Sequence, residues 1–268
     1  MKKIIGFIGG GNMGGAIIGG IIKSNIAKKE DVFVADLNKQ GLNCLADNYG
    51  VNTTTDNKEV AKKADILFLS VKPNVYKAVI EEIKDEVKDG VIIVVIAAGK
   101  SINEVQGMFG KEIKVVRVMP NTPALVGEGM AAISPNSLVT KEETEEIKEI
   151  FDSFGKSEVV GENLMDAVTG VSGSSPAFVY MFIEAMADSA VLNGMPRQQA
   201  YKFAAQTVLG SAKMVLETGK HPGELKDMVT SPGGTTIEGV TKLEELGMRN
   251  AVIQAQNACI EKSKKMSK

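Results

Sequence analysis

The residues best suited to chemistry near the start of the chain are the glycines of the segment GGGNMG at positions 9–14. The segment follows the apolar run Ile4–Ile8 and precedes Ala16-Ile17-Ile18, a pattern that predicts a strand, a tight turn and the start of a helix. Glycines at such a turn let backbone N–H groups approach a pyrophosphate at the positive end of the helix. The segment therefore indicates a nicotinamide or flavin dinucleotide as the ligand.

A carboxylate at the end of the next predicted strand strengthens this interpretation. The strand covers Val32–Asp36, and Asp36 stands near the offset of about 20 residues at which an acid meets the adenosine ribose. A glycine turn alone also occurs for steric reasons. Here strand, turn, helix, strand and acid stand in the required order, which favours a dinucleotide site.

The uncharged stretch 4–22, which follows Lys2-Lys3, also has the pattern of a signal peptide or a membrane helix. Eight of its residues are glycine, however, and no small-residue cleavage pattern precedes Lys28-Lys29. We see no second apolar span after it. We therefore expect a soluble, cytoplasmic protein.

Composition narrows the class of partner. The chain has 268 residues, 44% of them apolar and 24% charged, with a net charge of −2. This balance gives no electrostatic case for nucleic acid or an acidic membrane surface and favours a small-molecule ligand. Cys44, Cys259 and the single His221 are too far apart to predict a metal site or a nucleophile triad, so no metal is expected.

The elements that position these residues change in kind along the chain. Up to about residue 160 apolar strands alternate with helical segments, which predicts a doubly wound parallel sheet. Strands are expected at Ile4–Ile8, Val32–Asp36, Ile66–Val71, Val91–Ala97, Val115–Met119, Ala131–Ile133 and Glu158–Val160. We expect a dinucleotide-binding domain of Rossmann type over residues 1–160.

From Leu164 onward the pattern is helical, and we expect a second domain over residues 161–268. Helices are predicted from Ser175-Pro176 to Asn193-Gly194, from Pro196-Arg197 to Thr218-Gly219, at Glu224–Val229, at Ile237–Leu246 and from Met248 to Lys264. The Phe and Met residues between Phe178 and Met195 would suit a hydrophobic ligand pocket, but their helical spacing favours packing. We expect this helix to pack against a second subunit.

Three loops follow predicted strands and should meet at the nucleotide turn, because ligands of open parallel sheets lie beyond the carboxyl ends of the strands. They are Val71-Lys72-Pro73, Ala97-Ala98-Gly99 and Met119–Pro123. Proline and glycine also suit ordinary strand-to-helix turns, which is the alternative interpretation of each loop.

The segment SPGGTTIE at 231–238 predicts a flexible turn followed by a helix start. Free N–H groups at that start would hold a carboxylate, and the threonine hydroxyls could donate to a substrate nitrogen or oxygen. A helix capped by Thr235 or Thr236 is the alternative, and both can be true together.

Taken together, these motifs closely resemble those of the pyrroline-5-carboxylate reductase family. The most specific are GVSGSSPA at 170–177 and SPGGTT at 231–236, supported by FIGGGNMG at 7–14, VKP at 71–73, MPNTP at 119–123 and HPG at 221–223. The resemblance covers essentially the whole chain. It implies an all-α C-terminal dimerisation domain like that of 6-phosphogluconate dehydrogenase, an interlocked homodimer and, in many members, a ring of dimers.

The resemblance also implies a site, carried over by motif. The coenzyme, NADPH or NADH, should meet Gly9, Gly11, Asn12 and Met13 at the pyrophosphate turn, Ala35 and Asp36 at the ribose, Asn57 nearby, and Val71, Lys72, Pro73, Ala97 and Ala98 at the nicotinamide half. The substrate should meet Met228, Val229, Gly233, Gly234, Thr235 and Thr236, with Glu162 close by.

The implied reaction is reduction of L-1-pyrroline-5-carboxylate to L-proline, the last step of proline biosynthesis. A cyclic imine needs a hydride and a proton, and it is basic enough to arrive partly protonated, so no strong protein acid is required. Thr236 is the expected hydrogen-bond donor to the imine nitrogen. Asp36 favours NADH because a carboxylate repels a 2′-phosphate, although Asn38 and Lys39 lie close enough to compensate, so we expect either coenzyme to work.

Two other functions fit parts of the pattern. A β-hydroxyacid dehydrogenase shares this domain order but needs a lysine early in the first long helix of the second half, and no lysine occurs between Gly170 and Glu184. A non-catalytic nucleotide-sensing dimer would have no use for the segment 232–236. Both are tested by assaying the cyclic imine against hydroxyacids.

Overall fold

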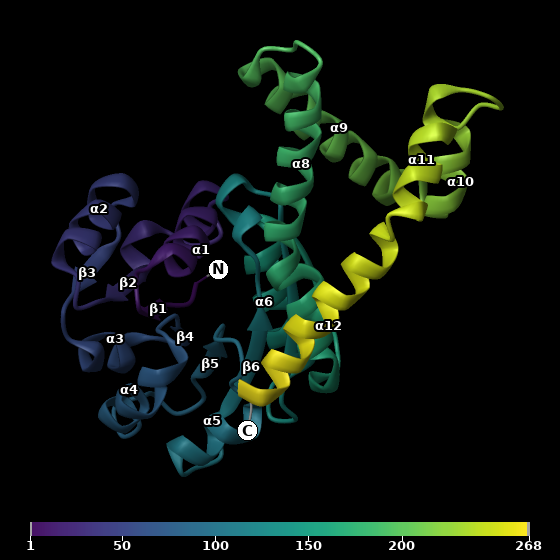
Figure 1. Ribbon diagram of the computed structural model, residues 1–268. Helices are drawn as coiled ribbons and strands as arrows, with labels where there is room; N and C mark the ends of the chain where they lie inside the picture. Colours follow the sequence, from purple (N-terminus) through teal and green to yellow (C-terminus); the bar gives the residue numbers. More distant parts are fainter. Residues whose placement is uncertain (1, 267–268) are drawn as a thin grey trace. The chain divides into compact units, whose positions relative to one another are not determined.

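The structure, a computed structural model, describes residues 2–266 and contains an eight-stranded sheet in its N-terminal part (Figure 1). The strand order is β3-β2-β1-β4-β5-β6-β7-β8. All neighbouring strands are parallel except β6 and β7. The strands are β1 (Ile5–Ile8), β2 (Val32–Ala35), β3 (Asn52–Thr54), β4 (Ile66–Leu69), β5 (Ile92–Val95), β6 (Lys114–Met119), β7 (Gly129–Pro135) and β8 (Gly155–Val159).

Helices cover both faces of this sheet, as the continuous apolar runs of its central strands require. The core on one face contains side chains of α1 (Asn12–Lys23), α2 (Lys39–Tyr49) and α6 (Lys141–Asp152). The core on the other face contains side chains of α3 (Asn57–Lys63), α4 (Tyr76–Ile83) and α5 (Ile102–Phe109). The predicted doubly wound domain is confirmed.

Two features of the sheet were not predicted. Strand β3 was missed because Asn52-Thr53-Thr54 is polar and lies at the sheet edge, where no apolar run is needed. Strand β7 runs antiparallel to β6 because residues 120–128 connect the two strands with only a 3₁₀ turn, Thr122–Val126. A parallel connection needs a crossover of a dozen or more residues.

The C-terminal part is helical, as predicted. It contains α8 (Ser175–Leu192), α9 (Arg197–Thr218), α10 (Pro222–Met228), α11 (Thr235–Glu245) and α12 (Met248–Met266). The chain divides into two compact units, one holding residues up to Ser174 together with the chain end from Cys259, the other Ser175–Ala258. The expected domain boundary at residue 160 stays a prediction.

The α-helix α8 begins at Ser175, as expected, but the expectation that Ser175 is an N-cap is wrong. The chain is already helical from the 3₁₀ turn Glu162–Leu164 through α7 (Met165–Val168), and a π-helical turn, Thr169–Ser174, leads directly into α8. Proline cannot donate the backbone hydrogen bond of a helix interior, and a π turn widens the helix at such a residue. The sequence signal for a cap therefore marks a widened turn inside one longer helical stretch.

That stretch, Glu162–Leu192, also contradicts our expectation of no second apolar span. By length and composition, this stretch of 31 residues could cross a membrane. Only 6% of its most apolar 18-residue segment is buried in the single chain. The first apolar stretch, 4–22, is by contrast divided into β1, the glycine turn and α1. An apolar helix left uncovered in a single chain is also what a subunit interface leaves behind.

Candidate functional site

The glycine turn between β1 and α1 has the steric properties that a dinucleotide site requires. Gly9 has a φ of +100°, and a Cβ built on it would lie 2.6 Å from the carbonyl oxygen of Ser70. A Cβ on Gly14 would lie 2.6 Å from the carbonyl oxygen of Gly9. Gly9 thus permits the tight turn and Gly14 the close approach of helix and strand.

Gly11 differs from both. A Cβ on Gly11 would meet nothing within 4 Å, and its φ of −68° suits any residue. The folded chain therefore gives no steric reason for a glycine here, whereas close backbone approach to a pyrophosphate does. No side chain among the described residues caps the start of α1, and its first turn has no acidic residue, so its N–H groups suit an anion. Asn12 and Met13 are the first residues of this helix.

Asp36 lies against the same turn. Its Oδ2 accepts a 2.7 Å hydrogen bond from the backbone N–H of Gly10, and its Oδ1 accepts one of 2.8 Å from the N–H of Asn38. Ala35, at the end of β2, accepts a 2.8 Å bond from the N–H of Gly9. The structure therefore brings the predicted ribose residues into contact with the predicted pyrophosphate turn.

The loop after β4 completes this edge of the sheet. The N–H of Ser70 donates to the carbonyl of Ile8 at 2.8 Å, which places Val71, Lys72 and Pro73 directly after a contact with β1. The Ser70 hydroxyl is buried and has no hydrogen-bond partner in the described chain. A buried donor of this kind beside a ligand turn fits a site that takes a further polar group.

Tyr76 joins the loops that follow β4 and β5. Its hydroxyl is fully buried and donates a 2.6 Å hydrogen bond to the carbonyl of Leu69. Burial raises the pKa of this phenol well above its ordinary value, although hydrogen bonds with the backbone of Ala97 and Ile96 act in the opposite direction. Tyr76 also belongs to the same buried cluster as the predicted nicotinamide residue Ala97, a relationship that the sequence did not reveal.

Two of the predicted site residues have partners that were not expected. Asn57, at the start of α3, donates from Nδ2 to Oε2 of Glu82 on α4 at 2.8 Å. Glu162 accepts at Oε1 a 2.8 Å bond from the N–H of Ile102 and a 3.2 Å bond from Arg117. Their roles toward coenzyme and substrate stay predictions.

The predicted substrate residues lie in one continuous segment of the helical unit. Met228 ends α10, Val229 follows it, and Gly233 turns with a φ of +66°. Gly234 is the N-cap of α11, so the expectation that Thr235 or Thr236 caps this helix is wrong. Both threonines instead occupy the first helical positions, because the extended Gly234 precedes them.

The starts of α1 and α11 share a feature. Each has a glycine N-cap and no side-chain cap. Helices α4 and α9 also lack a side-chain cap, but their N-caps are Val75 and Pro196, whereas Asn38, Asp56, Ser101 and Thr140 cap α2, α3, α5 and α6 with their own side chains. A self-capped helix has satisfied part of its N-terminal amides internally. The two predicted ligand segments keep theirs available for an anion.

Comparison with known proteins identifies the family. Residues 162–266 match the family model described as pyrroline-5-carboxylate reductase dimerisation, and residues 4–99 match one described as NADP oxidoreductase, coenzyme F420-dependent. The pyrroline-5-carboxylate reductase of Escherichia coli (strain K12) is 54% identical over 268 residues, which is 100% of both proteins. The chain belongs to the pyrroline-5-carboxylate reductase family.

Solved structures of this family agree in fold. A pyrroline-5-carboxylate reductase of Coxiella burnetii has a TM-score of 0.93 at 34% identity, with 100% of each chain covered. The Plasmodium falciparum enzyme, solved with NADP bound, has a TM-score of 0.91 at 36% identity and covers 100% of this chain and 99% of its own. The predicted NAD(P)H-dependent oxidoreductase activity, reduction of pyrroline-5-carboxylate in proline biosynthesis, is confirmed in preference to the hydroxyacid dehydrogenase and the sensor.

The helical unit agrees with the self-association that its family model describes. Large apolar side chains of α8 and α9 are exposed in the single chain, among them Met181 (68%), Phe203 (65%) and Leu216 (82%). Its described buried apolar residues are the small Ala187, Ala200 and Ala204. Such a unit needs a further surface to bury its apolar side chains, so the prediction of packing between subunits is confirmed at the level of dimerisation.

Sequence reasoning missed several residues that support the site. Asn121 lay within a recognised motif, yet its role appears only in the structure: Nδ2 donates to the carbonyl of Ser172 at 3.1 Å, and Oδ1 accepts from the N–H of Met130 at 2.8 Å. It thereby ties the loop after β6 to the π turn. Arg117 gave one signal, a charge flanked on both sides by the apolar residues Val116 and Val118 within β6.

Proposed function

We propose that the chain reduces L-1-pyrroline-5-carboxylate to L-proline with Thr236 as the hydrogen-bond donor to the imine nitrogen and the first amides of α11 as the carboxylate site. The observation that carries this proposal is the glycine-capped start of α11, where Thr235 and Thr236 precede the first acidic residue, Glu238. The substrate is an anion with a basic ring nitrogen. A free helix start and a hydroxyl supply a partner for each group.

A bound nicotinamide coenzyme supplies the hydride, and the residues of the chain orient the reactants. Gly9, Gly11, Asn12 and Met13 would hold the pyrophosphate, while Ala35 and Asp36 would meet the ribose. Val71, Lys72, Pro73, Ala97 and Ala98 would border the nicotinamide half. Catalysis then depends mainly on positioning, because the substrate brings its own proton.

Most of the proposed substrate residues belong to one segment of the helical unit. They are Met228, Val229, Gly233, Gly234, Thr235 and Thr236, and Glu162 is the further residue that we assign to the substrate. Met228 and Val229 are more than half exposed at the end of α10, which leaves their side chains free for an apolar ring. We assign residues 1–160 to the coenzyme domain and 161–268 to the substrate and dimerisation domain.

We further propose that the chain acts in the cytoplasm, without a membrane, as an interlocked homodimer that assembles into a ring of dimers. The apolar stretch Glu162–Leu192 supports an interlocked arrangement, because a helix with only 6% of its most apolar window buried needs partners on more than one side. Contacts with these partners would bury the apolar side chains of the stretch, so it needs no lipid environment.

The test is oxidation of NADPH and of NADH by the purified chain with pyrroline-5-carboxylate, followed by absorbance, with proline identified as product by chromatography. A β-hydroxyacid with NAD⁺ and NADP⁺ provides the contrasting substrate. We expect turnover with the imine and none with the hydroxyacid. Coenzyme binding without turnover of the imine would leave only the sensor alternative.

A further inference from the structure

Arg117 is a buried charge at an unexpected place in the sheet. It lies within β6, paired with Val95 of β5 and Ser134 of β7, and only 4% of its surface is exposed. Its strand neighbours Val116 and Val118 are fully buried in the apolar core. Removing a guanidinium from water in this way costs several kcal/mol, on the order of a whole domain's net stability.

The hydrogen bonds of Arg117 do not offset that cost fully. One Nη atom contacts Oε1 of Glu162 at 3.2 Å, whereas Nε and the other Nη are buried with no partner among the described residues. An arginine with two unsatisfied nitrogens contributes little to stability compared with an apolar residue of the same size. Its presence therefore calls for a role beyond packing.

Glu162 connects this arginine to the predicted coenzyme loop. The Oε1 atom of Glu162 accepts a hydrogen bond from Arg117. The same atom accepts the 2.8 Å hydrogen bond from the N–H of Ile102, the first residue of α5. Residues 96–101 link β5 to that helix and include Ala97 and Ala98. The carboxylate thus holds the end of the loop, and Arg117 holds the carboxylate.

The other end of the loop is packed as well. Ala97 belongs to the same buried cluster as Tyr76, and Ala98 packs against the cluster of Met119, Ala132 and Met165. The Arg117–Glu162 pair is therefore one of the two anchors that set the position of this predicted coenzyme loop. A displacement of about 1 Å at a reacting centre can reduce a rate about 100-fold.

We propose that Arg117 is a positioning residue that acts through Glu162 to fix the start of α5 and the loop at Ala97-Ala98. The inference rests on the proposed function, in which this loop borders the nicotinamide. It also assigns Glu162 a structural part in the site, with its partly exposed carboxylate held in place from beneath. Replacing Arg117 should lower turnover more than it weakens coenzyme binding, because the predicted pyrophosphate turn lies next to β1 and not next to β5 or β6.

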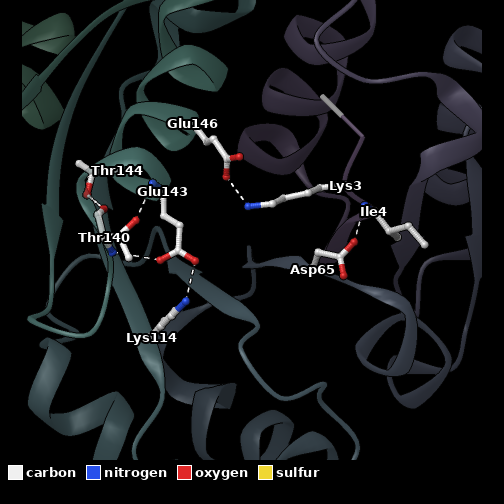
Figure 2. Close-up of polar contacts among 8 residues, drawn as sticks. All are labelled: Lys3, Ile4, Asp65, Lys114, Thr140, Glu143, Thr144 and Glu146. Atoms are coloured by element: carbon white, nitrogen blue, oxygen red, sulfur yellow. Dashed lines mark hydrogen bonds and ion pairs between the residues drawn. The ribbon is translucent and has the colours of Figure 1, made fainter.

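The chain offers a matched control on the same strand. Lys114, three positions before Arg117 on β6, forms a 2.6 Å ion pair with Glu143 of α6, at the edge where the strands begin (Figure 2). Lys114→Met removes a partly buried positive charge and its ion pair without touching α5. Any effect shared by Lys114→Met and Arg117→Met reflects stability alone.

The experiment compares Arg117→Met, Arg117→Lys, Glu162→Gln and the double variant Arg117→Met/Glu162→Gln. We expect Arg117→Met to lower kcat at least 10-fold with less than a threefold change in the Kd of NADPH, and Arg117→Lys to recover part of that loss. Since the two residues act in series, the double variant should be no slower than the worse single variant. Lys114→Met should keep kcat within twofold of the wild type.

A second measurement does not depend on activity. Amide hydrogen exchange of the coenzyme-free protein should become at least 10-fold faster at residues 97–102 in Arg117→Met and Glu162→Gln, and stay unchanged there in Lys114→Met. Normal kcat in folded Arg117→Met, additive losses in the double variant, or unchanged exchange at Ile102 would each overturn the inference. If Arg117→Met does not fold, Glu162→Gln and Arg117→Lys decide the question. An inactive wild type would instead overturn the proposed function.

Discussion

The carboxylate of Asp36 accepts a 2.7 Å hydrogen bond from the backbone N–H of Gly10. The residue predicted to select the coenzyme is therefore also attached to the turn predicted to bind the pyrophosphate. This relationship couples coenzyme preference to the shape of the turn, because removing the carboxylate changes both the local charge and one of the contacts that hold the turn.

The first prediction concerns that coupling. Asp36→Ser removes the negative charge that repels a 2′-phosphate, so we expect the ratio of kcat/KM for NADPH to that for NADH to rise at least 10-fold, about 1.4 kcal/mol. Steady-state kinetics with both coenzymes measure the ratio. Asp47→Ser, on the exposed side of α2, is the control and should leave it unchanged. An unchanged ratio in Asp36→Ser would mean that the carboxylate serves only the turn.

The second prediction separates Gly9 from Gly11. Gly11→Ala should fold normally, because its Cβ meets no protein atom within 4 Å, but should weaken NADPH binding at least 10-fold by blocking close approach of the pyrophosphate. Gly9→Ala should lower stability by several kcal/mol, since it combines a φ of +100° with a contact of 2.6 Å. Fluorescence titration and thermal unfolding measure the two effects.

Gly107→Ala provides the control for that pair. Gly107 lies inside α5, and its Cβ would also meet nothing within 4 Å. Alanine there should raise stability by about 0.5–1 kcal/mol through helix propensity and leave coenzyme binding unchanged. Normal NADPH affinity in Gly11→Ala would remove that residue from the coenzyme site.

The third prediction concerns Thr236. Thr236→Ala should lower kcat about 10- to 100-fold, because it removes one hydrogen bond at the reacting end of the substrate, while NADPH affinity and the oligomer remain as in the wild type. Thr236→Ser should retain most of the activity. Thr241→Ala, on an exposed position of the same helix, is the control and should have no effect. Unchanged turnover in Thr236→Ala would exclude Thr236 from the mechanism.

The fourth prediction follows from the charged residues at the edge where the strands begin. Burial alone would raise the pKa of Asp65, but hydrogen bonds from Lys88 and from the N–H of Ile4 outweigh it and hold the pKa below its ordinary value. Figure 2 shows the contact between Asp65 and Ile4. The pKa of Glu143 is lowered in the same way, against its burial, by Lys114 and the N–H of Thr140.

A carboxylate with a lowered folded-state pKa stabilises the fold at pH values above its unfolded pKa, about 4 for these residues, and loses this contribution as the pH falls through the folded pKa. Denaturant midpoints should therefore decline as the pH falls below about 5. Asp65→Asn should be less stable at neutral pH and show a flatter decline. Equal slopes for Asp65→Asn and the wild type would show that Asp65 contributes nothing to acid unfolding.

The fifth prediction tests the subunit interface. Phe203 on α9 is 65% exposed in the single chain, and Phe203→Asp should weaken the dimer because it places a charge in an apolar contact. Light scattering on a sizing column should show a shift toward monomer at micromolar concentration. Leu125→Asp, at a residue 60% exposed in the N-terminal unit, should keep the wild-type mass. An unchanged mass in Phe203→Asp would exclude this part of α9 from the interface.

The sequence by itself determined the alternation of strands and helices, the glycine turn, Asp36 and the segment 231–236, because these depend on local chemistry. An apolar run, a glycine with positive φ or an uncapped helix start acts within a few residues of itself. Periodicity likewise predicted most strands and all five helices of the C-terminal part to within a few residues. Several errors were local conflicts, among them the polar edge strand β3, the π turn before Pro176 and the glycine that caps α11 in place of a threonine.

Only the tertiary structure decided which distant residues meet. Arg117 and Glu162 are 45 positions apart, Asp36 and Gly10 are 26 apart, and neither pair has a local pattern that reveals it. Their contacts depend on the order in which strands enter the sheet, and on the short connection that turns β7 antiparallel to β6. Chemistry carried by single residues is readable along the chain, whereas chemistry that needs two side chains at 3 Å appears only when packing brings them together.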